Sequence, residues 1–143
     1  MTLKMSESHR AMLRSHGLVL ARIALGGLFF LTGLQIIMGG MAGINMTAGM
    51  IASVGLPGSM VLALIVVAIK LLGGGALMLG YRVGLAAGSL ILFTLAATFF
   101  FHTGPTEMGV FGWDMGLFKN LAIIGGLLYA MAYGPGEGWR VQK

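Results

Sequence analysis

Four long apolar runs constrain this chain more than any other feature of its sequence. They cover residues 17–38, 57–80, 83–101 and 117–133. Each is close to the roughly 20 helical residues that cross a bilayer, and none alternates between apolar and polar positions as a barrel strand does. Hydrophobic residues make up 57% of the chain and charged residues only 9%. We therefore predict an all-α integral membrane protein that forms a four-helix bundle.

The basic residues predict the orientation of the bundle. Those that fall on one side of four spans are Lys4, Arg10, Arg14, Arg22, Arg82, Arg140 and Lys143. Basic residues favour the cytoplasmic side, so we expect a multi-pass protein of the bacterial inner membrane with both termini in the cytoplasm. The expected parts are an N-terminal tail (1–16), a membrane domain (17–134) and a C-terminal tail (135–143). This topology explains most of the net charge of +5 without a nucleic-acid partner.

The first outer loop predicts a short helix of its own. Thr47 is a suitable cap for a helix over residues 47–53, which Gly55 and Pro57 would end. Four apolar residues lie on this helix or directly beside it: Met46, Met50, Ile51 and Val54. We expect this helix to lie on the membrane surface or to cap the bundle.

Lys70 is a charge near the middle of the second run, where no acidic residue neutralises it. Placing such a charge at the bilayer centre costs roughly 2.5 to 3.5 kcal/mol, so it usually faces a bundle interior or a cavity. Three interpretations stay open. In the first, Lys70 has a structural role: it donates to helix carbonyls or to Thr94 or Thr98, or extends its stem toward the interface. In the second, it pairs with an acidic group of a partner protein. In the third, it binds a ligand or takes part in proton transfer.

Glycine, with 25 of 143 residues, predicts close packing of the helices. Packing within the chain is the simplest interpretation, and a dimer seam or a cofactor slot is the alternative. The residues expected at a partner contact are Lys70, Gly73, Gly74, Gly84 and Gly88.

A second polar group is expected where the third and fourth runs meet the outer face. It consists of His102, Glu107, Asp114, Lys119 and Asn120. Structural hydrogen bonds, a quinone-headgroup or anion site and a metal site are the three interpretations, although the spacing matches no metal motif. Across the chain, the candidate cofactor-binding residues are Lys70, Gln35, His102 and Lys119. Quinone stays open as the cofactor, and the sequence carries no haem, metal or nucleotide signature.

Several stretches in order along the chain resemble the DoxX family of small four-helix membrane proteins. They are residues 22–33 (RIALGGLFFLTG), 48–57 (AGMIASVGLP), 71–80 (LLGGGALMLG) with Arg82, 98–102 (TFFFH), and 118–128 (FKNLAIIGGLL) followed by Gly134-Pro135-Gly136. The chain departs from the family pattern at two positions. DoxX-like sequences usually carry a lysine at the position of Ile36 and a glutamate at that of Lys70. Any activity that needs this acid does not carry over.

Three functions fit these residues. The first is a non-catalytic accessory, scaffold or assembly subunit of a respiratory or redox membrane complex; the resemblance implies a setting of thiosulfate and quinone chemistry. The second is a quinone-interacting oxidoreductase subunit, which predicts a flat apolar slot with a polar end. The third, a small transporter, needs a polar path that Ser89, Thr94 and Thr98 hardly supply. We favour the first, with other membrane subunits or further copies of this chain as partners, and leave an enzymatic role open.

Overall fold

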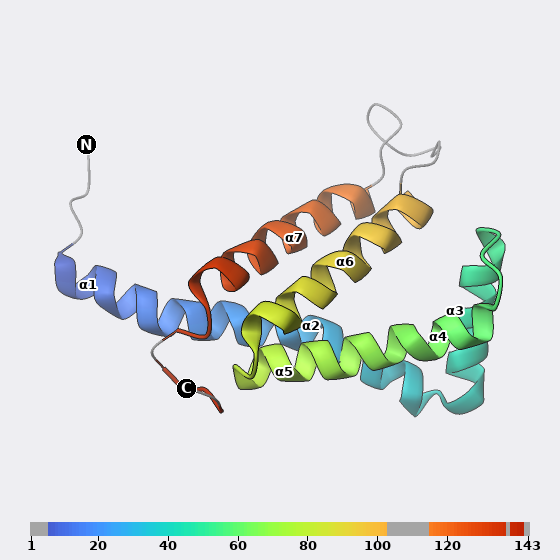
Figure 1. The fold of residues 1–143 in the computed structure, drawn as a ribbon, viewed down its shortest axis with the longest axis horizontal. Coiled ribbons are helices and arrows are strands. Elements are labelled where there is room, and N and C mark those ends of the chain that lie inside the picture. The colour runs from blue at the N-terminus through green and yellow to red at the C-terminus, as the bar shows by residue number, and fades with distance from the viewer. Residues whose placement is uncertain (1–5, 103–114, 137, 142–143) are drawn as a thin grey trace.

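The computed structural model describes residues 6–102, 115–136 and 138–141, and its helices cross the molecule as four long rods (Figure 1). The first rod joins α1 (Glu7–Met12), the π-helical turn η1 (Leu13–Gly17) and α2 (Leu18–Met38). The second joins α4 (Ser59–Ala68), the π-helical turn η2 (Ile69–Gly73) and α5 (Gly74–Leu79). The third is α6 (Val83–His102) and the fourth is α7 (Met115–Tyr133). All four are long and apolar enough to span a membrane, which confirms the predicted all-α membrane bundle.

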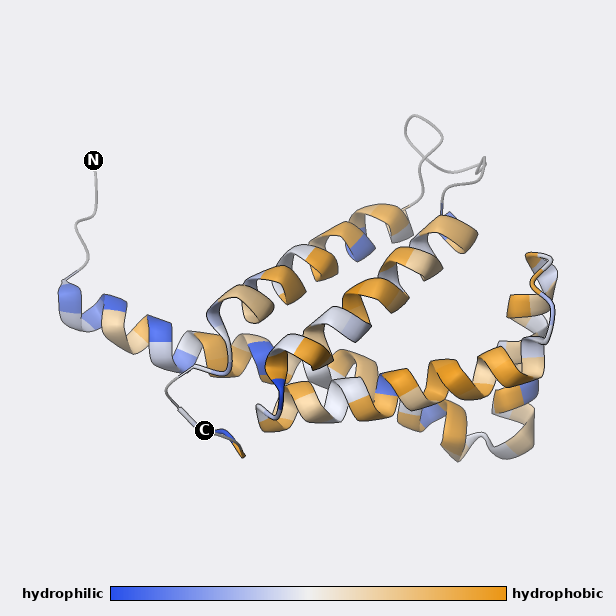
Figure 2. Cartoon of the chain, in the orientation of Figure 1, coloured by the Kyte–Doolittle hydropathy of each residue, from blue (hydrophilic) through white to orange (hydrophobic). Residues whose placement is uncertain are grey.

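The first rod begins at Glu7, within the segment expected as an N-terminal tail. Its start is set by Ser6, whose hydroxyl accepts a hydrogen bond from the His9 backbone N–H. The rod has 32 residues, which corresponds to about 48 Å at ~1.5 Å per residue. The rod is therefore longer than a hydrocarbon core, which is about 30 Å thick. Its polar N-terminal part extends beyond the other helices (Figure 2).

The helix of the first outer loop is present but longer than the sequence predicts. This helix, α3, runs from Gly40 to Ser53, so the proposed cap at Thr47 is wrong. Thr47 lies inside the helix, is buried, and donates its hydroxyl to the Gly43 carbonyl at 3.0 Å. Figure 1 shows α3 running across the end of α4, opposite the end that holds both termini. The end of the bundle at α3 is called the α3 end, and the opposite end, which holds both termini, is called the terminal end.

The centre of the bundle depends on a close crossing of α2 and α5. A Cβ added to Gly74 would lie 2.6 Å from the Phe30 backbone nitrogen and 2.7 Å from the Gly26 carbonyl oxygen. The two backbones are therefore in direct contact, as the glycine pattern predicts for packing within the chain. Such contacts replace the hydrophobic driving force that lipid removes. The surrounding core includes Phe29, Leu77, Leu90 and Leu127.

A buried polar chain links α6 to α7. The Asn120 side-chain amide donates to the Thr98 hydroxyl at 3.0 Å, and that hydroxyl donates to the Thr94 carbonyl at 2.6 Å. The Thr94 hydroxyl donates to the Leu90 carbonyl at 2.7 Å. Thr94 and Thr98 therefore use their hydroxyl protons on their own helix.

Candidate functional site

Lys70 lies in η2, the π-helical turn in the middle of the second rod. Single π-helical turns inside α-helices are frequent at functional sites. The stem of Lys70 passes α2 at Gly33, where an added Cβ would lie 2.9 Å from the Lys70 Cβ. The Nζ atom lies 5.6 Å from the centroid of the Phe93 ring on α6. The side chain is half-buried and is held between two neighbouring helices.

The charge of Lys70 has little compensation from the residues that the structure describes. Phe93 offers a cation–π contact, which is worth about 0.5 to 1 kcal/mol at exposed sites. Within residues 6–102, 115–136 and 138–141, Nζ has no hydrogen-bond acceptor, and the nearby charge that acts on it is the like charge of Lys119. Of the acidic residues, Glu7 alone is described, and it lies at the distant start of the first rod.

Lys70 lines an apolar cavity of about 880 Å³ near the α3 end of the bundle. Its lining residues come from α2, α3, α4, η2 and α6. Figure 1 shows that α6 diverges from α4 toward the α3 end. Its walls are mainly aliphatic, aromatic and methionine side chains, among them Ile36, Met50, Ile65, Phe93 and Phe100. Its polar side chains are Thr32, Gln35, Thr47 and Lys70. It is therefore an open apolar cavity with a few hydrogen-bonding groups, a combination typical of small-molecule sites.

The structure brings together some of the residues that the sequence singles out and separates others. Lys70 and Gln35 both line the cavity, and so does Ile36, the other position at which the chain departs from the DoxX pattern. Lys119 is exposed near the start of α7, and His102 ends α6; neither lines this cavity. Glu107 and Asp114, expected beside them, lie outside the described residues. No group of three metal-ligating side chains occurs among the residues that are described.

The glycines expected at a partner contact differ in their surroundings. Gly74 is buried against α2, and a Cβ at Gly73 would lie 3.1 Å from a Leu90 methyl carbon on α6. Both therefore serve packing within this chain. Gly84 and Gly88 on α6 have nothing within 4 Å of an added Cβ, so that surface is open to lipid or to a partner.

Arg22 has a structural role that the sequence does not reveal. Its side chain is only 1% exposed, and its guanidinium donates to the Pro135 carbonyl at 2.6 Å and to the Trp139 carbonyl. Gly80 leaves room for this guanidinium, and Gly80 also adopts φ +72°, which favours glycine. The Val141 backbone N–H donates to the Leu79 carbonyl at 2.9 Å. The C-terminal segment is thus fixed to the terminal end of the bundle.

The fold and the cavity define a small four-helix integral membrane protein with an open apolar cavity that holds a few polar side chains. A model of the DoxX family matches residues 17–103, which is more than half of the chain. The chain therefore belongs to the DoxX family, as its sequence resemblance predicts. No curated protein and no solved structure matches it.

Proposed function

We propose that this protein is an accessory subunit of a bacterial inner-membrane redox complex and that it provides that complex with a quinone-binding cavity. Both termini face the cytoplasm in this proposal. The observation that carries it is that Lys70 and Gln35 both line one apolar cavity of about 880 Å³. The sequence alone favours a purely structural subunit, but this geometry gives more support to the quinone-interacting alternative.

The residues that line the cavity fit the parts of a quinone. The ammonium of Lys70 and the amide of Gln35 are hydrogen-bond donors for carbonyl oxygens, and Phe93 offers an aromatic face for a flat ring. The aliphatic and methionine side chains of α3 and α4 suit an isoprenoid tail. Lys70 thereby gains an acceptor, which the described protein residues do not give it.

The departure from the family pattern supports the same proposal. The pattern places a lysine and a glutamate at the positions of Ile36 and Lys70, and both positions line this cavity. A chain with both residues would hold a neutral pair there, whereas this chain holds a lone positive charge. Such a charge favours a ligand whose oxygen atoms become more negative when it is reduced.

A bound quinone supplies the electron-transfer chemistry, and the residues of this chain bind and orient it. The sequence contains no cysteine, so the chain has no thiol redox pair of its own. In the proposal a partner subunit therefore exchanges electrons with the quinone. The open surface of Gly84 and Gly88 on α6 is the proposed contact for this partner.

Replacing Lys70 by methionine is expected to weaken quinone binding by roughly tenfold to a hundredfold, because a hydrogen bond from a charged donor contributes about 1.5 to 3 kcal/mol. The measurement is a binding titration of the detergent-purified protein with short-tail ubiquinone and menaquinone analogues. Arg82→Met is the matched control, since it removes a positive charge from a residue that does not line the cavity. It should leave the affinity within about twofold.

Two results would count against the quinone site. Equal affinity of the Lys70→Met variant and the original protein would show that the cavity does not hold the headgroup. Absence of quinone binding by the original protein, combined with loss of co-purifying subunits on Lys70→Met substitution, would favour the structural subunit, with Lys70 meeting a partner's acid.

A further inference from the structure

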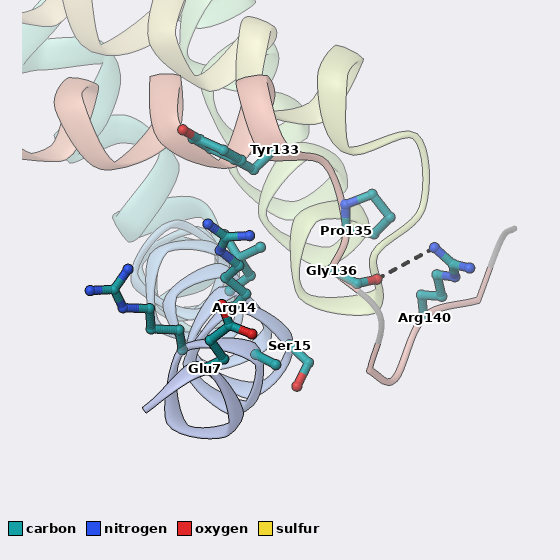
Figure 3. Close-up of a pocket in the computed structure, with 10 residues that line it drawn as sticks. Glu7, Arg14, Ser15, Tyr133, Pro135, Gly136 and Arg140 are labelled. Atoms are coloured by element: carbon teal, nitrogen blue, oxygen red, sulfur yellow. Dashed lines mark hydrogen bonds between the residues drawn. The ribbon is translucent and has the colours of Figure 1, made fainter. Parts of the chain in front are cut away.

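A second concave surface lies at the terminal end of the bundle, where the first rod and the C-terminal segment face each other (Figure 3). It is a groove of about 640 Å³, here called the basic groove. Arg10 and Arg14 come from the first rod, and Arg140 comes from the C-terminal segment. Glu7 also lines it, so the groove keeps a net positive charge. The groove is distant from the quinone cavity and shares no residue with it.

The two walls of the basic groove are held in place by the fold. The first rod continues from α2 without a break, so Arg14 is carried on a helix that the membrane bundle supports. The opposite wall is fixed by Arg22, which holds the carbonyls of Pro135 and Trp139. Arg140 also donates to the Gly136 carbonyl at 3.4 Å, which directs its guanidinium toward Gly136 (Figure 3). Arg14 and Arg140, from opposite ends of the chain, thus line one groove from its two walls.

An apolar groove of about 440 Å³ adjoins the basic groove. The two share Arg14, Leu18 and Tyr133. From these residues the apolar groove extends along the helices toward Ala21 on α2 and Tyr129 on α7. The rings of Tyr129 and Tyr133 lie 4.4 Å apart between their centroids and form one of its walls. The basic groove therefore passes directly into an apolar groove that follows α2 and α7.

We propose that the two adjoining grooves bind one anionic phospholipid. The arginines of the basic groove hold its phosphate, since guanidinium groups donate parallel hydrogen bonds to phosphate oxygens. One acyl chain lies in the apolar groove beside Ala21 and Tyr129. The bias of basic residues toward one membrane face explains why arginines occur at the terminal end of the bundle, but it does not require that they line one groove beside an apolar one.

The test is native mass spectrometry of the full-length protein in detergent, titrated with dioleoylphosphatidylglycerol or dioleoylphosphatidylcholine. We expect one tightly bound phosphatidylglycerol and much weaker binding of phosphatidylcholine. The double variant Arg14→Gln, Arg140→Gln should weaken phosphatidylglycerol binding by about thirtyfold, from the usual contribution of each basic residue near an anionic lipid. Arg82→Gln, which removes a positive charge from the α5–α6 turn outside both grooves, should change it by less than twofold.

A further variant separates a lipid from a free phosphate ion. Ala21→Phe fills the apolar groove and keeps every charge, so it should weaken phosphatidylglycerol binding severalfold, and millimolar inorganic phosphate should not displace the lipid. The lipid proposal is overturned if Ala21→Phe has no effect while phosphate competes freely, because the site would then bind an anion alone. It is also overturned if Arg82→Gln weakens binding as much as the double variant, because general charge would then explain the affinity.

Discussion

A Gly74→Val variant is expected to lose most of the stability of the bundle. The added Cβ would lie 2.6 Å from the Phe30 nitrogen and 2.7 Å from the Gly26 carbonyl oxygen, and both of these are backbone atoms. No side-chain rotation relieves these contacts, so α2 and α5 have to separate along the crossing that joins the first two rods. Overpacking of a well-packed core costs about 1 to 3 kcal/mol of stability. Because this clash involves backbone atoms, we expect Gly74→Val to cost about 3 kcal/mol or more.

The measurement for Gly74→Val is thermal or SDS-induced unfolding in detergent micelles. Gly88→Val is the matched control, because it makes the same substitution in a membrane helix where an added Cβ has nothing within 4 Å. The control should unfold within a few degrees of the original protein. Equal stability of the two variants would show that the α2–α5 crossing is looser than described.

Replacing Arg22 by methionine should release the C-terminal segment from the bundle. The substitution removes the donors to the Pro135 and Trp139 carbonyls and leaves an apolar chain in the space beside Gly80. Hydrogen bonds from a charged donor contribute about 1.5 to 3 kcal/mol each, so the expected loss of stability is at least ~2 kcal/mol. An Arg22→Lys variant should recover only part of it, because an ammonium lacks the planar fork that reaches two carbonyls.

Limited trypsin digestion measures this release directly. Arg140 lies within the anchored segment, so cleavage after it should become at least tenfold faster in the Arg22→Met variant. Arg82→Met, which replaces an exposed arginine in the turn between α5 and α6, should leave the cleavage rate unchanged. Unchanged cleavage in the Arg22→Met variant would mean that other contacts, such as the hydrogen bond between Val141 and Leu79, hold the segment without Arg22.

The spans themselves are predictable from the sequence, because helix length and apolar composition are local properties that the bilayer selects directly. The start of α3 is not predictable in this way. Its N-cap Gly39 and its first residue Gly40 carry no capping side chain, and Asn45 and Thr47, the nearest residues with the chemistry of a cap, lie inside the helix. The observed helix gains its stability instead from packing Ala48 and Ile51 against Ala63 of α4.

The candidate site is only partly visible in the sequence. Lys70 stands out because a charge in an apolar run is costly, and Gln35 because it is polar near a helix end. Their place in the lining of one cavity depends on the divergence of α6 from α4 and on the position of α3, which arise from long-range packing. The role of Arg22 depends on contacts with residues more than a hundred positions away. Gly134-Pro135-Gly136 is the sequence signal that points to an ordered C-terminal segment.

Photolabelling with a diazirine-bearing short-tail quinone, reconstituted with the protein in lipid bilayers, tests the cavity most directly. Peptide mapping should place the label on the cavity side of α3 and the second rod, near Met50 and Lys70, and the Lys70→Met variant should lose most of it. Labelling confined to lipid-facing residues such as Leu92 of α6, with no dependence on Lys70, would contradict the account.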